Sequence, residues 1–138
     1  MTIQPISFGN LTISKQNYND KQKVSFGYSN KLKTLFKQGL LPTVKVDAAG
    51  NRLTRKNVTL DHIIPKSKGG VSCTANYMLA EKEFNNMRSN EPLLDWVTME
   101  GIMRYLNQFV DVKVKGFNGN EYIAKVLRTL DKANEIGI

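Results

Sequence analysis

The spacing of apolar residues divides the chain into an aperiodic start and a patterned remainder. Residues 1–29 are rich in Asn, Gln, Ser, Thr and Lys and show no sustained period, so we expect an extended or partly disordered lead-in. From Asn30 the apolar residues recur at helical spacing, which predicts one short helix that stops at Gly39. Alternation on either side of an Ala-Gly-Asn turn then predicts a small hairpin within residues 43–55.

Two more helical patterns follow later in the chain. Pro92 opens a series of apolar residues that runs to Val110, and Gly101 weakens its middle, so we expect a kinked helix or two pieces. Asn118 and Glu121 have the spacing of a capping box in front of an apolar stripe, which predicts a last helix. Both segments are expected to supply core.

Between these parts, residues 57–90 have the pattern of a strand, a loop, a second strand and a helix. An apolar run ends in Asp-His-Ile-Ile-Pro at 61–65, a Gly-Gly loop follows, and the second strand begins at Asn76. Because neighbours on a regular strand point to opposite faces, Asp61 and His62 can share a site only if the strand ends or bulges there. The proline and glycines just beyond His62 predict that regular pairing soon stops.

The helix after the second strand carries another candidate. Ala80, Phe84 and Met87 form its expected apolar stripe, and helical geometry places Asn85 beside that stripe, at the border of the core. Asn86 lies nearly opposite Phe84, so we expect it to be solvated.

Composition and charge narrow the class of protein. The 138 residues suit one domain, which we place at 30–138. With 20 Lys and Arg against 12 Asp and Glu, the net charge of +8 favours a polyanionic partner, although solvated lysines produce the same total. The single cysteine, Cys73, excludes an internal disulfide and indicates a reducing compartment. Neither a membrane span nor a secretory signal is evident, so we expect a cytoplasmic protein with no membrane partner.

His62 is the only histidine of the chain and directly follows a carboxylate. An imidazole, with an unperturbed pKa of about 6.5, accepts a proton near neutral pH, so His62 is the candidate to activate water. The alternative is a structural histidine bonded to a backbone group. The adjacent Asp61, the Gly-Gly loop and the downstream asparagines favour the functional interpretation.

The series Asp-His-Ile-Ile-Pro, Ser, Gly-Gly, Asn-Tyr-Met-Leu-Ala and a helix with Asn and Arg resembles the motif of HNH endonucleases. The resemblance covers about a quarter of the chain. The chain would be an H-N-N variant of the motif, with His62, Asn76 and Asn85 at the three named positions. It implies an α+β fold with a ββα-metal core at about 57–90, flanked by an N-terminal helix and hairpin and by C-terminal helices. It also implies a metal-dependent endonuclease that hydrolyses phosphodiester bonds and leaves 5′ phosphates, on DNA rather than RNA.

The same resemblance assigns roles to individual residues. Asp61 and Asn85 ligate one divalent cation, His62 is the general base, and Asn76 braces the loop that bears His62. Oxygen ligands favour Mg²⁺, with Mn²⁺ as a substitute, and the ion stabilises the leaving oxygen while His62 takes a proton from water. Arg88 is expected to hold a substrate phosphate, although a lone arginine more often forms a surface ion pair.

Three points stay open. Lys66 and Lys68, just after His62, either contact the substrate backbone or form a solvated loop. The paired CxxC zinc ligands of many HNH proteins are missing, so we expect no structural zinc and a core held by packing alone. A catalytically silent nucleic-acid-binding module and a toxin-type nuclease with an immunity protein as partner are the alternative functions.

Overall fold

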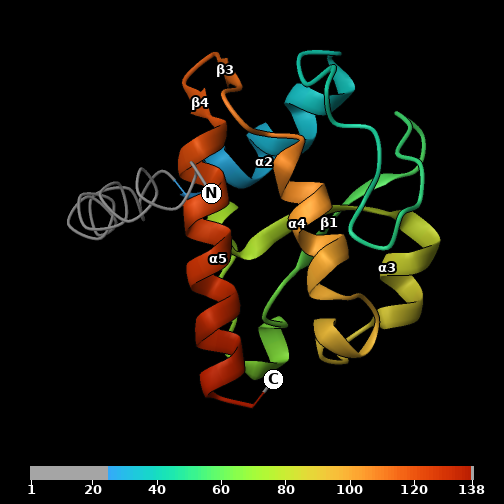
Figure 1. Ribbon diagram of the computed structural model, residues 1–138, viewed down its shortest axis with the longest axis vertical. Helices are drawn as coiled ribbons and strands as arrows, with labels where there is room; N and C mark the ends of the chain where they lie inside the picture. Colours follow the sequence, from blue (N-terminus) through green and yellow to red (C-terminus); the bar gives the residue numbers. More distant parts are fainter. Residues whose placement is uncertain (1–24, 138) are drawn as a thin grey trace.

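The structure, a computed structural model, describes residues 25–137 (Figure 1). The helices are α2 (Ser25–Lys37), α3 (Lys82–Arg88), α4 (Met99–Asn107) and α5 (Gly119–Glu135). Strands β1 (Val58–His62) and β2 (Tyr77–Glu81) pair antiparallel, as do β3 (Lys113–Val114) and β4 (Phe117–Asn118). The 3-10 helices η1 (Lys66–Lys68), η2 (Thr74–Asn76) and η3 (Leu93–Asp95) lie in the connections. The described residues therefore form an α+β fold, as expected.

The first helix is longer than the apolar pattern predicted. It begins at Ser25 rather than at Asn30, so the lead-in expected for 1–29 does not extend through its last residues. Residues 1–24 of that lead-in lie outside the described residues. The predicted stop holds, because α2 ends just before Gly39, whose φ of +76° is the left-handed conformation that glycine adopts at little cost.

The expected hairpin is reduced to a single bridge between Val46 and Arg52. The buried carboxylate of Asp47 organises its turn, with Oδ1 accepting a hydrogen bond from the backbone N–H of Asn51 at 2.7 Å. Oδ2 of the same side chain accepts the backbone N–H of Glu81 at 2.9 Å, at the end of β2. One carboxylate thus ties the turn to the central strands.

The segment after Pro92 forms two pieces, η3 and α4, but Gly101 is not the break. The helical pattern is interrupted before Thr98, whose Oγ1 caps α4 by accepting the N–H of Gly101 at 3.0 Å. A Cβ on Gly101 would lie only 2.3 Å from the carbonyl oxygen of Ala48. Glycine is needed there because α4 packs directly against the backbone near the turn.

The last helix begins as predicted, since Oδ1 of Asn118 accepts the backbone N–H of Glu121 at 3.0 Å. In Figure 1, α4 and α5 stand side by side in front of the strands, and α3 lies to the right of α4. Fully buried side chains join these helices in the core: Ile102, Tyr105, Leu106, Phe109, Tyr122, Ile123 and Val126. No helix among residues 25–137 has the length and apolar character needed to span a bilayer.

The outer edge of β2 is completed by side chains instead of a third strand. The backbone N–H of Leu79 donates to the hydroxyl of Tyr105 at 2.8 Å, and the hydroxyl of Tyr122 donates to the carbonyl of Tyr77 at 2.7 Å. The two hydroxyls lie 3.0 Å apart. Because the proton of Tyr122 is used on β2, Tyr105 must be the donor between them. Burial raises the pKa of both phenols, so both keep their protons.

We predict that Tyr105→Phe lowers the free energy of unfolding by about 1–3 kcal/mol, because it leaves the buried N–H of Leu79 without an acceptor. Urea denaturation measures the loss. Tyr77→Phe is the matched control, since the Tyr77 hydroxyl makes no hydrogen bond among the described residues. An equal loss in both variants would contradict the importance of this edge contact.

Candidate functional site

A fully buried arginine joins the end of β1 to the end of α3. Nη1 of Arg88 donates to Oδ1 of Asp61 at 2.5 Å and to the carbonyl of His62 at 2.8 Å. Nη2 donates to the carbonyl of Ile63 at 3.0 Å, and Nε to that of Glu91 at 3.0 Å. Since every guanidinium nitrogen has an acceptor, the buried charge is well compensated.

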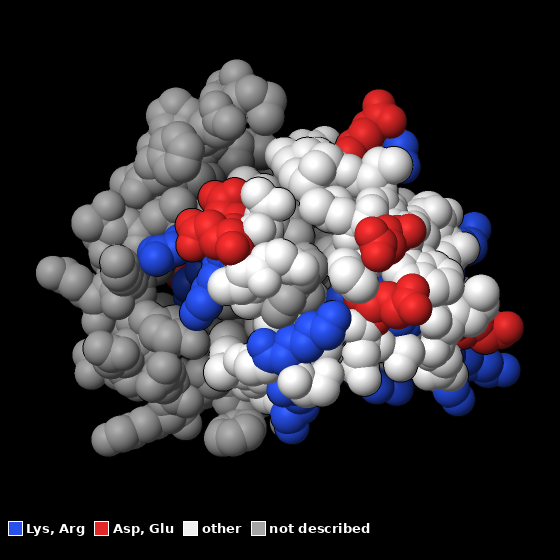
Figure 2. Space-filling view, turned by 90° about the horizontal axis from the view of Figure 1, so that it is seen from below, with Lys and Arg blue, Asp and Glu red and all other residues white. Residues whose placement is uncertain are grey.

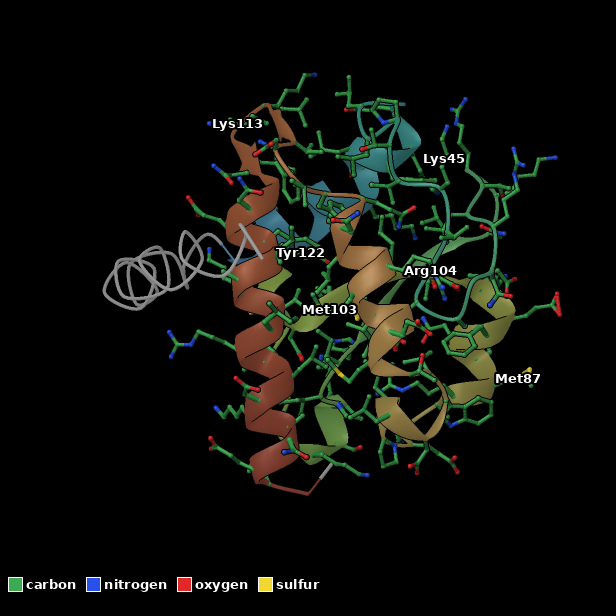
Figure 3. The ribbon with its side chains drawn as sticks, viewed as in Figure 1. Lys45, Met87, Met103, Arg104, Lys113 and Tyr122 are labelled. Carbon is green, nitrogen blue, oxygen red and sulfur yellow. The ribbon has the colours of Figure 1, made fainter. Side chains whose placement is uncertain are left out.

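This position corrects the expectation that Arg88 meets a substrate phosphate. Its side chain is 0 % exposed, so a phosphate does not reach it in this structure. The expected apolar stripe of α3 is rotated accordingly, because Met87 is 67 % exposed and points away from the core (Figure 3). Arg88, not Met87, faces β1, because its guanidinium forms an ion pair with the buried carboxylate of Asp61.

Asp61 is buried beneath α3 with one oxygen engaged. Burial raises the pKa of its carboxyl to about 6, while the charge and hydrogen bond of Arg88 act in the opposite direction and Asp47 adds a smaller increase. With a pKa near 6, the carboxylate is mostly ionised at pH 7. Oδ2 of Asp61 accepts no hydrogen bond from the described residues, so it is the oxygen that a cation would use.

Asn85 lies on the same side of β1 as Asp61. Its Nδ2 donates to Oγ1 of Thr59 at 3.0 Å and to the carbonyl of Leu60 at 3.2 Å. Thr59 and Asp61 alternate onto one face of β1, and Asn85 and Arg88 of α3 meet that face. Oδ1 of Asn85 has no hydrogen-bond partner among the described residues. Carboxylate and amide oxygens of this kind are ones that a hard cation such as Mg²⁺ could bind.

His62 points to the opposite face of β1. Regular pairing continues to His62, whose ring packs on its cross-strand partner Tyr77 with centroids 4.5 Å apart. Its Nε2 lies 3.5 Å from Oγ of Ser72. Burial, then the charges of Lys66 and Arg88, lower the pKa of the imidazole, so it is neutral and able to accept a proton at pH 7.

The structure thus separates the predicted residues into two groups. Arg88 contacts Asp61, and Asn85 contacts Thr59 and Leu60 of the same strand, whereas the His62 ring packs on Tyr77 across β1. The strand ends at His62, as the following proline and glycines predicted, but it does not bulge before that residue. All four residues therefore gather around the end of one strand without sharing one face.

Asn76 closes the loop that follows His62. Its Nδ2 donates to the carbonyls of Ile64 at 2.9 Å and Val71 at 3.0 Å, and its Oδ1 accepts the N–H of Ile64 at 2.8 Å. A Cβ on Gly70 would lie 1.7 Å from the carbonyl oxygen of Ile64, so only glycine fits that approach. Asn76 braces the loop, as expected of it, whereas a part in catalysis stays a prediction.

The remaining candidates are exposed. Lys66 and Lys68 are solvent-accessible residues of η1, directly beyond the end of β1. Among residues 25–137, no three His, Cys, Asp or Glu side chains gather in a group able to hold a metal. A cation at Asp61 and Asn85 would therefore rely on waters and substrate oxygens for its other ligands, as Mg²⁺ commonly does.

Comparison of the chain with family models, with curated proteins and with solved structures finds no match.

We predict that Arg88→Met lowers the free energy of unfolding by about 3–5 kcal/mol, because it leaves the buried carboxylate of Asp61 without its counter-charge. Chemical denaturation checks this. Arg104→Met is the control: Arg104 is exposed on α4, where Figure 3 labels it, and its loss is expected to cost less than about 0.5 kcal/mol. Similar losses in both variants would show that the Arg88 contacts contribute little.

Proposed function

We propose that the protein is a metal-dependent endonuclease of the HNH type that hydrolyses phosphodiester bonds in nucleic acid, with DNA as the preferred substrate. The main support is the strand end itself. Asp61 and Asn85 each offer an unbonded oxygen on one side of β1, and a half-buried imidazole of lowered pKa lies on the other side. These residues stand in the order and spacing of the HNH motif, on a unit of two antiparallel strands and a helix.

In this proposal Asp61 and Asn85 hold Mg²⁺, or Mn²⁺ in its place. The bound cation supplies positive charge that stabilises the leaving 3′ oxygen. His62 takes the proton from the attacking water, and the contact with Tyr77 limits how its ring can turn. Arg88 favours the ionised form of Asp61 and fixes the backbone carbonyls of His62 and Ile63.

In this proposal the substrate lies across the end of β1, where Asp61 and His62 are the last residues of the strand. Asn76 holds the following loop in place, so the path beyond His62 is well defined. Lys66 and Lys68 then flank that path with exposed ammonium groups suited to neighbouring phosphates.

The direct test is cleavage of plasmid and single-stranded DNA with Mg²⁺ or with a chelator. We predict metal-dependent cutting that His62→Ala reduces by about 10²–10⁴-fold, the usual contribution of a general base. Urea denaturation confirms that the variant is folded. Equal cutting by native and variant protein would reject His62 as the base.

The cation site has its own test in neighbouring asparagines of α3. We predict that Asn85→Ala weakens Mn²⁺ binding about tenfold or more, measured by electron paramagnetic resonance of the free ion, because an amide ligand is lost. Asn86→Ala, at the exposed next position, is the control and should bind Mn²⁺ like the native chain. If both variants bind alike, Asn85 is not a ligand.

A second candidate function is a catalytically silent nucleic-acid-binding module. Two observations favour it: Arg88 already neutralises Asp61, and strand alternation places His62 on the other face. This alternative predicts nucleic-acid binding without cutting under any metal condition, so the same cleavage assay decides between the two.

A further inference from the structure

A groove of about 720 Å³ lies between the loop after β1 and the last turns of α5. Apolar residues line it from the loop side, including Ile64, Val71 and Cys73. Val71 is 51 % exposed and lines the groove. The groove therefore offers apolar surface to a ligand from solvent.

Cations line the same groove from both walls. Lys68 comes from η1, and Lys125, Arg128 and Lys132 come from successive turns of α5, with Asp131 and Glu135 as the acidic lining residues. Lys68 and Lys132 are exposed. The Nζ of Lys125 forms an ion pair with Oε1 of Glu121 at 3.8 Å. The lining as a whole combines apolar contact area with a small excess of positive charge.

That combination suits single-stranded nucleic acid better than a duplex. Figure 2 looks onto this end of the molecule and shows basic and acidic side chains interspersed over the described residues. A single strand needs less: a groove with a few cations for its phosphates and apolar surface for the faces of its bases.

The groove also adjoins the candidate site. Its loop wall starts directly after β1, and Asn76, which closes that loop, lines the groove as well. Lys66 acts on the pKa of His62, and Lys68 of the same short helix lines the groove. The groove lining thus begins at Ile64, two residues after His62.

We propose that this groove binds a single-stranded segment of the substrate next to the cleavage position, with Lys68 and Lys132 on its phosphates and Val71 against a base. The proposal rests on the proposed function for the identity of the substrate. Binding itself requires no metal and no catalytic step, so it is measured separately from cutting.

The test is binding of a fluorescein-labelled oligothymidylate, and of a duplex of equal length, followed by fluorescence anisotropy in chelator at several salt concentrations. Lys68→Ala combined with Lys132→Ala should weaken single-strand binding roughly tenfold and reduce the salt slope by about 1.4, the value for two lost phosphate contacts. The control, Lys113→Ala with Lys115→Ala, removes the same charge at the opposite end of α5 (Figure 3) and should change binding less than about twofold.

The apolar lining has a matched pair of its own. Val71→Glu places a carboxylate at the groove and should weaken single-strand binding, whereas Leu94→Glu, at a similarly exposed position on η3, should not. Equal losses in either matched pair, or a larger loss for duplex than for single strand, would overturn the groove as a single-strand site. So would cleavage by a native chain that fails to bind the oligothymidylate.

The two proposals fail in different ways. His62→Ala leaves the groove lining unchanged, so its effect on cutting is measured apart from the effect of Lys68→Ala with Lys132→Ala on binding. Binding that depends on the groove, without any cutting, would reject the endonuclease proposal and support the groove proposal. Cutting that is insensitive to the groove variants would support the endonuclease proposal and reject the groove proposal.

Discussion

The fold depends on satisfying the free edge of a two-stranded sheet that is buried in the protein. Backbone groups left unpaired there would each be costly, because no water replaces the missing hydrogen bond. Three side chains remove this cost: Asp47 from the turn, Tyr105 from α4 and Tyr122 from α5. Parts of the chain that are distant in sequence are thereby held at defined positions along β2, and the strand pair is held with them.

The contact between α3 and the end of β1 depends on a buried charge. Arg88 holds the short helix α3 against the sheet, because its guanidinium is bonded to the Asp61 side chain and to backbone carbonyls at the end of β1. The same contacts determine which way the Asp61 carboxylate faces. Structure and candidate chemistry are therefore linked at this residue, since any change that releases the arginine also releases the proposed ligand.

Much of the architecture was predictable from local pattern. Apolar periodicity located the strand, loop, strand and helix unit, and the capping pair located the start of α5 at Asn118. Burial of Arg88 was not predictable, because a charged residue on a helix is assigned to solvent unless its partner in space is known. The tyrosine contacts on β2 span long sequence separations and leave no local signal. His62 lies on the face of β1 opposite Asp61 because strand pairing continues to His62, and the sequence alone did not determine where pairing stops.

The order of the elements has a consequence for synthesis of the protein. The ribosome makes β1, β2 and α3 before it makes α5. The carbonyl of Tyr77 therefore cannot accept its hydrogen bond from Tyr122 until α5 has been made. A helix as short as α3 is not stable alone, and its hold on Asp61 depends on a completed sheet. The contacts that complete the outer edge of β2, beside the candidate site, are therefore all in place only after α5 has been made.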